Sequence, residues 1–200
     1  MTKRLLILLL LTCSINAFAR KPNVSYGLEW GYTASFLRTV HYSFVCSDGY
    51  RIVDNSSSFN YFSNGSILAN VGLDLLPKLN LSVYSGLTGV WSDRWVVPVE
   101  LRLRFCPAGL YGDGFICSAG ASVNFPTKTL RETCFRASAG AGYRVAVFRD
   151  ISVDFLLSVG YSTDHDQIID PISGDIVTYS NISHNDSGYL GISLSAAINF

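Results

Sequence analysis

The sequence predicts an all-β protein: an eight-stranded antiparallel up-and-down transmembrane β-barrel, preceded by a cleaved signal peptide. Three observations predict this fold. Hydrophobic residues make up 48% of the chain, yet after residue 19 no apolar run approaches the roughly 18 residues that a membrane helix needs. Apolar residues instead alternate with small or polar ones in eight segments, which is the period of a strand with two different faces. Compact turns follow the second, fourth and sixth segments, whereas long polar connections follow the first and seventh.

Residues 1–19 predict a secretory signal peptide. Two basic residues precede an apolar run at residues 5–11, and Ala17 and Ala19 are small residues at the spacing that a signal peptidase recognises. The apolar run is too short to span a bilayer. Cleavage after Ala19 therefore leaves residues 20–200 as one β-barrel domain.

The first two strands are separated by a long polar segment. The first strand, residues 24–36, shows seven consecutive alternations between large apolar and small or polar side chains. Residues 38–65 predict a long loop with a base that can stay ribbon-like, because Ser, Asn, Asp and Gly accumulate there. The second strand, residues 67–75, ends at the tight turn that Pro77 favours.

The other six strands alternate in the same way and are separated by residues that favour turns. They cover residues 79–91, 97–105, 115–125, 135–145, 151–161 and 187–200. Residues 162–186 are rich in Asp, Asn and Ser and predict a second long loop. The last strand alternates up to Phe200, so we expect it to be held by pairing with the first strand, which closes the barrel.

The composition of the polar face indicates which face lines the interior. A soluble barrel of the lipocalin kind, apolar inside and polar outside, is the alternative. A water-facing surface is rich in Lys and Glu, whereas the mature chain contains three lysines, Lys21, Lys78 and Lys128, and the polar face is mostly Gly and Ser. We therefore expect the apolar face to point outward to lipid and the small residues to fill a narrow lumen.

Large aromatic residues of the apolar face gather near the predicted strand ends. At the long-loop end they are Phe36, Trp91, Phe125, Phe135 and Tyr161, and at the turn end Phe105, Phe115, Tyr143 and Phe200. Two such rows match the aromatic girdles of membrane barrels. Trp30 and Tyr32 lie nearer to mid-strand and do not follow this pattern.

The carboxy-terminal segment Ala-Ala-Ile-Asn-Phe200 resembles the signal that the barrel-assembly machinery reads. With its strand pattern, the chain resembles the small outer-membrane β-barrel family common in Bacteroidetes, and more broadly the eight-stranded barrels of Gram-negative outer membranes. This resemblance implies an outer-membrane location, contact with outer-membrane lipids, and Phe200 as an assembly signal. It implies no single activity, because such barrels include adhesins, inert anchors, pores and lipid-modifying enzymes.

Eight charged residues are predicted to face the lumen. The acids are Glu29, Asp74, Glu100 and Asp154, and the bases are Arg102, Arg104, Arg136 and Arg144. A buried charge is costly unless it is paired, so these groups should form ion pairs. We expect the three charges of residues 100–104 to be the centre, reaching Asp74, Glu29 or Arg136, and to plug the lumen. A narrow pore is the alternative.

A catalytic or cofactor site is not predicted. His165, His184, Asp186 and Ser187 could support acyl transfer, but their spacing does not reproduce the His-x-Ser pattern of barrel lipid A deacylases. No metal-ligand spacing is present, and a net charge of +0 gives no basic footprint for nucleic acid. A lipid-modifying enzyme therefore stays a lesser alternative.

Four cysteines remain in the mature chain, Cys46, Cys106, Cys117 and Cys134. Cys106 should point inward and Cys117 outward, which argues against a bridge between them. A bridge between Cys46 and Cys134 at the long-loop end is possible, but free apolar thiols are the favoured interpretation.

The two long loops suggest the function. Together, residues 38–65 and 162–186 hold most of the chain that the barrel does not use, and the first contains Tyr42, Phe44, Tyr50, Phe59, Tyr61 and Phe62. Aromatic side chains supply contact area in recognition surfaces. We expect a scaffold that meets an unknown extracellular ligand or surface through these loops.

Overall fold

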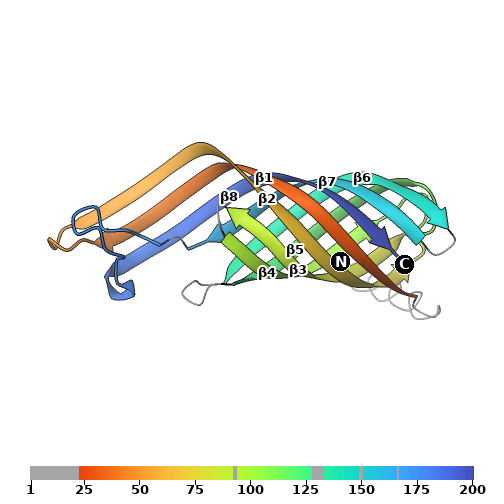
Figure 1. The fold of residues 1–200 in the computed structure, drawn as a ribbon, viewed down its shortest axis with the longest axis horizontal. Coiled ribbons are helices and arrows are strands. Elements are labelled where there is room, and N and C mark those ends of the chain that lie inside the picture. Colours follow the sequence, from red (N-terminus) through yellow and green to blue (C-terminus); the bar gives the residue numbers. More distant parts are fainter. Residues whose placement is uncertain (1–22, 92–93, 128–132, 149–150, 166) are drawn as a thin grey trace, which may run out of the picture.

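Eight antiparallel strands form one closed barrel in the computed structural model, in the order β1 to β8 with β8 next to β1 (Figure 1). The strands are β1 Val24–Val45, β2 Arg51–Leu76, β3 Leu79–Trp91, β4 Arg94–Phe105, β5 Gly114–Pro126, β6 Cys134–Phe148, β7 Ile151–Asp164 and β8 Ile182–Asn199. The structure describes residues 23–91, 94–127, 133–148, 151–165 and 167–200. The predicted fold class is confirmed, while the predicted signal peptide with Ala17 and Ala19 lies outside the described residues.

The last strand closes the barrel against the first. The two strands pair from Gly27↔Asn199 to Phe44↔Ile182. The backbone of Phe200 is itself paired, since the amide of Tyr26 donates to the Phe200 carbonyl at 3.1 Å and the amide of Phe200 donates back at 2.7 Å. Apolar and polar residues therefore alternate up to Phe200 because the last residues pair with β1 in the barrel wall, as predicted.

The apolar face of the barrel points outward. On β1 the side chains of Tyr26 and Trp30 are 56% and 50% exposed, whereas Glu29 between them is 4% exposed. The same alternation continues on β4, where Leu101 is exposed and Arg102 is buried. A soluble barrel with an apolar interior is thus excluded for this chain. No helix among the described residues is long and apolar enough to cross a membrane.

The barrel continues at one end into a ribbon, which we define as residues 37–45 of β1, 51–61 of β2 and 182–186 of β8. Figure 1 shows it projecting beyond the other strands, at the opposite end from the chain's C-terminus. The prediction of a loop at residues 38–65 is wrong, because this segment pairs in register from Leu37↔Phe59 to Val45↔Arg51. Pairing with β1 overrides the local turn preference of its Ser and Asn residues.

A β-bulge exchanges the two faces of β1 where the ribbon begins. The register shifts between Ser35 and Leu37. Beyond the shift, Val40 and Phe44 are 7% and 1% exposed, although their even numbers place them with outward-facing Tyr32 in an unbroken alternation. One extra residue inverts the face of every later side chain. The weak pattern after residue 36 is therefore a bulged strand and not the start of a loop.

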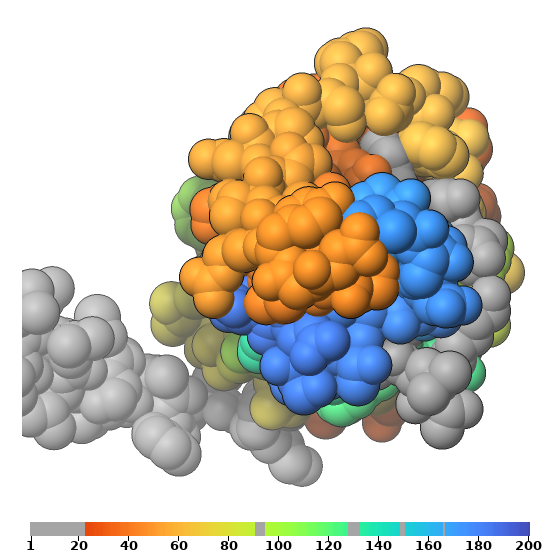
Figure 2. All heavy atoms as spheres, turned by 90° about the vertical axis from the view of Figure 1, so that its left-hand side faces the viewer, coloured from red at the N-terminus to blue at the C-terminus, as the bar shows by residue number. Residues whose placement is uncertain are grey.

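The described part of the β7–β8 loop, residues 165 and 167–181, folds against the ribbon and does not extend freely. Ile168 packs with Phe44 and Cys46 in a small apolar cluster, and the Ser47 amide donates to the Asp170 carboxylate at 2.7 Å. The loop ends in the short 3-10 helix η1, Tyr179–Asn181. Seen end on, the β7–β8 loop lies beside the tip of the β1–β2 hairpin (Figure 2). The predicted second loop is thus shorter than 162–186, because β7 and β8 extend into it.

The β4–β5 connection covers the opposite end of the lumen. The amide of Leu110 donates to the Pro77 carbonyl at 3.0 Å. The Leu110 side chain packs against Cys106, Ile116 and Leu156 inside the barrel. A guanidinium nitrogen of Arg144 donates to the Leu110 carbonyl. This connection is therefore fixed to the wall by both apolar and polar contacts.

Candidate functional site: the charged lumen

The middle of the lumen is organised by Arg102 on β4. Its Nη1 contacts Glu29 of β1 at 2.6 Å, and its Nε contacts Glu100 at 2.7 Å. The guanidinium also lies over the Tyr84 ring of β3, 4.0 Å from the centroid. All of these side chains point inward because they occupy the buried positions of their alternating strands. One cation is thus held between two carboxylates and an aromatic face.

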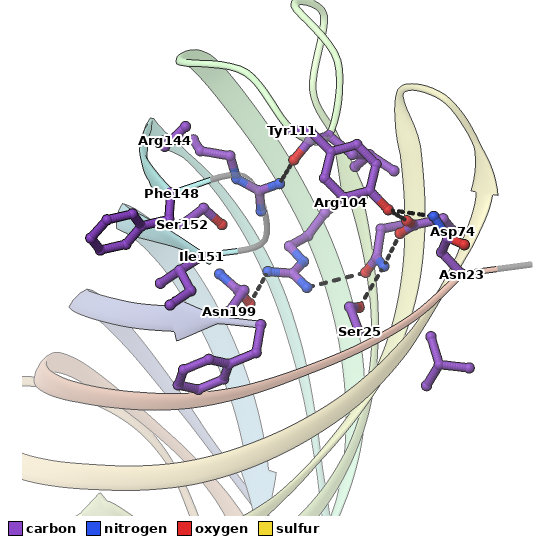
Figure 3. Close-up of a pocket in the computed structure, with 15 residues that line it drawn as sticks. Asn23, Ser25, Asp74, Arg104, Tyr111, Arg144, Phe148, Ile151, Ser152 and Asn199 are labelled. Carbon is purple, nitrogen blue, oxygen red and sulfur yellow. Dashed lines mark hydrogen bonds between the residues drawn. The ribbon is translucent and has the colours of Figure 1, made fainter.

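A second layer, nearer the turn end, is organised by Asp154 on β7. Its carboxylate accepts hydrogen bonds from Arg144 at 2.6 and 2.7 Å, from Arg104 at 3.1 Å and from the Asn199 amide at 3.0 Å. Arg104 also donates to Asn199 at 2.8 Å and to Asn80 at 3.1 Å. Figure 3 shows Arg104 and Arg144 in this layer. Both side chains line a cavity at the turn end of the barrel. Asp154 is fully buried, so its negative charge depends on these donors.

The two remaining predicted lumen charges are held by neutral partners. Asp74 accepts from the Asn80 amide at 2.8 Å and from the Tyr111 hydroxyl, and Arg136 donates to the Ser193 hydroxyl at 2.9 Å. Neither takes part in an ion pair within the part of the chain that the structure describes. Of the three partners predicted for residues 100–104, the structure therefore brings Glu29 alone into contact with Arg102.

The packing of these side chains leaves little open volume in mid-lumen. A cavity of about 40 Å³ lies beside Glu29, Glu100 and Arg136, which is room for a few water molecules. A wider cavity of about 360 Å³ opens at the turn end, and Arg104, Arg144 and Asn199 are among the residues that line it (Figure 3). The lumen therefore narrows from the turn end toward its charged middle.

Uncharged lumen residues complete the network and were not singled out in the sequence. Asn80 and Asn199 connect Arg104 to its surroundings, and Ser82 accepts from Arg104 at 3.2 Å. Tyr84 is fully buried between Arg102 and Arg104. Their positions on the polar face of each strand were evident from alternation. A residue pattern does not reveal which of many polar side chains reach an arginine across the barrel.

The three histidines of the chain gather where the ribbon leaves the barrel. His184 Nε2 lies 2.8 Å from one oxygen of Asp186, and His165 Nδ1 lies 3.7 Å from the other. His41 packs edge-on against His184, with ring centroids 4.5 Å apart. Within the described residues, no group of three such side chains is placed to hold a metal ion.

Ser187 does not lie on the same face of β8 as His184 and Asp186. Ser187 is 2% exposed and belongs to the lumen-facing positions of β8, while Asp186 and His184 belong to the exposed face. Consecutive strand residues point to opposite faces. These four residues, His165, His184, Asp186 and Ser187, therefore do not form the Ser/His/acid arrangement considered from the sequence.

The cysteines occupy separate environments. Cys46 lies in the ribbon cluster, and Cys106 lies with Leu110 in the apolar cluster of the lumen. Cys117 is partly exposed and Cys134 is buried. No disulfide joins any two of these four described cysteines.

Two ionisable groups, Asp170 of the β7–β8 loop and Tyr42 of the ribbon, have shifted pKa values with clear causes. The amide of Ile172 donates to Asp170 at 2.9 Å, and with the Ser47 amide it lowers the pKa of this carboxyl group. Burial raises the pKa of Tyr42, and the neighbouring Asp54 raises it further. Asp170 therefore joins the β7–β8 loop to the β1–β2 turn in its charged form.

Comparisons with known proteins give low similarity. No family model matches the chain, and no curated protein matches it. Neisserial surface protein A aligns with a TM-score of 0.47 and 11% identity over 88% of this chain and 98% of its own. The outer membrane protein OprG from Pseudomonas aeruginosa aligns with a TM-score of 0.47 and 9% identity over 88% and 95%. These values assign no family and no activity to the chain.

Proposed function

We propose that this protein is an outer-membrane anchor with a closed lumen, which presents its ribbon outside the cell as an interaction module. The observation that carries the proposal is the ribbon itself. The ribbon is a paired extension of β1, β2 and β8. The β7–β8 loop packs against it through Ile168 and Asp170. A barrel that served as a pore or an anchor alone would not need such an extension.

The outward surface supports a membrane location. Large apolar side chains such as Leu28, Leu101, Phe155 and Leu194 are about half exposed or more on the barrel wall. A contiguous apolar surface of this kind is unfavourable in water and favourable in lipid. The closed hydrogen-bonded wall also leaves no sheet edge at membrane depth, as spanning strands require. The chain would then be stabilised by the hydrocarbon core around it.

The lumen contacts support a closed anchor over a pore. Arg102 and Asp154 are each bound by two or more charged or amide groups, and the cavity beside Glu29, Glu100 and Arg136 holds about 40 Å³. Opening a passage would separate buried ion pairs, and leaving one buried charge without its partner costs about 3–5 kcal/mol. The ion-pair plug is therefore energetically expensive to remove.

The ribbon has the properties of a prefolded binding surface. Phe44, Cys46 and Ile168 give it an apolar cluster of its own. Its exposed face carries Phe59 and Tyr61, which are 76% and 64% exposed. A surface that is already ordered loses less conformational entropy on binding than a flexible loop. This favours recognition of a partner over a role as a passive connection.

A truncation that keeps the barrel tests the proposal. Residues 38–58 would be replaced by Asn-Gly, which joins the paired positions Leu37 and Phe59 through a two-residue hairpin turn. Liposomes containing wild-type protein should bind members of an array of extracellular matrix proteins and glycans, and the truncated form should not. Both forms should keep the heat-dependent electrophoretic shift of a closed barrel. Equal array binding by a correctly folded truncation would remove the proposal.

A further inference from the structure

One edge of the ribbon has no strand beside it. Residues 51–61 of β2 pair with β1 on one side. The pairing of β2 with β3 begins at Ser66↔Thr88, so no described strand pairs with the other side of residues 51–61. In a strand, alternate residues direct their N–H and C=O groups to each side. About half of these residues therefore present main-chain donors and acceptors to the surroundings.

The opposite edge of the ribbon is formed by residues 182–186 of β8, and the β7–β8 loop contacts it. The pairing of β8 with β7 ends at Ser187↔Asp164, which leaves residues 182–186 beyond β7. The β7–β8 loop contacts this edge, because the His165 ring hydrogen bonds to the Asn185 carbonyl. Asp164 in turn accepts from the His165 amide at 2.7 Å. The short edge therefore has a main-chain partner from the loop, whereas no described strand pairs with the long edge.

Most of the open edge also lacks the usual features that keep edge strands from pairing. Such strands commonly carry charged residues, lysine above all, or proline. Residues 51–61 contain no lysine or proline, and their two charges, Arg51 and Asp54, lie at the end next to the β1–β2 turn, so residues 55–61 carry none of these features. The side chains that they expose are apolar or aromatic at three positions of one face, Val53 at 62%, Phe59 at 76% and Tyr61 at 64%. Phe59 packs on Phe36, and the Tyr61 hydroxyl lies 3.4 Å from the Tyr32 hydroxyl. This face is therefore held in place beside the edge.

We propose that residues 51–61 of β2 bind an extended protein segment by β-strand addition. The segment pairs its main chain with the open edge, and its apolar or aromatic residues lie beside Val53, Phe59 and Tyr61. Main-chain pairing supplies affinity in this mode of recognition, and alternate side chains supply selectivity. The inference rests on the proposed interaction role of the ribbon, and it names the partner's chemistry.

A synthetic peptide of residues 37–45 is a suitable probe, because this β1 sequence already pairs with β2 in a known register. Three forms would be titrated against the full protein in detergent micelles: unmodified, N-methylated at even positions, and N-methylated at odd positions. An added strand directs alternate amides to the edge, and its side-chain pattern fixes which ones. One methylated form should bind like the unmodified peptide and the other about tenfold more weakly or worse. Binding of both methylated forms, or of no peptide at all, would overturn the inference.

A pair of matched protein variants places the peptide on the edge. Val53→Lys puts a charge on the edge strand, and Ser43→Lys puts the same charge on its direct partner in β1, which is flanked on both sides. Lysine on an edge opposes strand addition. Val53→Lys should weaken peptide binding about tenfold or more, and Ser43→Lys should leave it within about threefold. Equal effects would place the peptide elsewhere and contradict the inference.

The same variants separate this inference from the proposed function. If the truncation of residues 38–58 abolishes array binding while Val53→Lys preserves it, the ribbon binds through another surface and strand addition is wrong. If the truncation itself has no effect on array binding, the proposed function fails, whatever the peptide does.

Discussion

Asp154 is the residue on which the turn-end layer of the lumen depends. It accepts hydrogen bonds from Arg104, Arg144 and Asn199, and it is fully buried. Two arginines share this one carboxylate. Its charge therefore compensates more than one neighbour, and its loss would leave both guanidinium groups short of a counter-charge.

Asp154→Ala should destabilise the barrel by about 3–5 kcal/mol, because breaking a buried pair leaves an uncompensated charge. Urea unfolding in detergent or lipid vesicles, followed by tryptophan fluorescence, measures the change. Asp48→Asn, at an exposed position of the ribbon tip, is the control and should change stability by less than about 0.5 kcal/mol. A loss below 1 kcal/mol for Asp154→Ala would show that the layer relaxes without it.

Asp170 makes the ribbon tip sensitive to acid. Two backbone amides, those of Ile172 and Ser47, lower its pKa below the ordinary 3.8. A carboxyl group whose pKa is lowered by folding stabilises the folded state above its ordinary pKa, and this contribution is lost as the pH falls through the lowered value. The contact between the β7–β8 loop and the β1–β2 turn should therefore weaken below about pH 3.8.

Hydrogen exchange of the Ser47 and Ile172 amides checks this expectation. Protection should be constant from pH 7 to 5, after correction for intrinsic exchange, and should fall at lower pH. Asp170→Asn removes the titrating group and should abolish this pH dependence while the barrel strands stay protected. Persistence of the acid-induced loss in Asp170→Asn would assign it to another group.

At the scale of elements, the ribbon is a small packed unit. Phe44 is 1% exposed and contacts the β7–β8 loop through Ile168. Val45 follows Phe44 in β1 and lies on the opposite face of the strand. The ribbon's rigidity should therefore depend on the even-numbered side chains of β1 beyond the bulge and little on the odd-numbered ones.

Phe44→Ala should remove about 3–5 kcal/mol from local stability, the usual cost of such a truncation in a packed cluster. Exchange protection should fall in residues 37–61 and remain in β3 to β7. Val45→Ala should have a much smaller effect. Global loss of protection in Phe44→Ala would mean that the ribbon and barrel unfold as one unit.

The sequence predicted the barrel strands well and the ribbon poorly, for a physical reason. Strands such as β5 and β6 keep one unbroken alternation between two environments, so their faces were evident. In β1 a single bulge near residue 36 inverts the alternation, and in β2 polar residues occupy a strand that is solvated on one side. Pairing across the hairpin, which no local pattern encodes, holds both segments extended.

The lumen residues were similarly predictable in type but not in pairing. Alternation placed Glu29, Arg102, Arg104 and Asp154 inside. Which acid meets which arginine depends on the strand stagger and on side-chain reach across the barrel. The partners expected for the charges of residues 100–104 are Asp74, Glu29 and Arg136, whereas Arg104 meets Asp154 of β7 at 3.1 Å.

At the scale of the whole molecule, the charged layers of the lumen predict that the barrel does not conduct ions. Purified protein in a planar bilayer should show no steady conductance, because the cavity in the middle of the lumen holds about 40 Å³ and Arg102 beside it is paired with Glu29 and Glu100. The triple variant Glu29→Ser, Glu100→Ser, Arg102→Ser removes Arg102 together with both of its carboxylate partners and leaves smaller side chains, so it should conduct more than wild type. Steady conductance of the wild-type protein would contradict the closed-lumen account.

The central claim is an outer-membrane barrel with its ribbon outside and its turns inside, and surface labelling tests it most directly. Asp48→Cys marks the ribbon tip and Lys78→Cys marks the β2–β3 turn at the opposite end. In intact cells of a Gram-negative host, a membrane-impermeant maleimide should label the first variant above the wild-type background. It should label the second after the outer membrane is permeabilised. Labelling of Lys78→Cys in intact cells, or protection of Asp48→Cys there, would contradict the account.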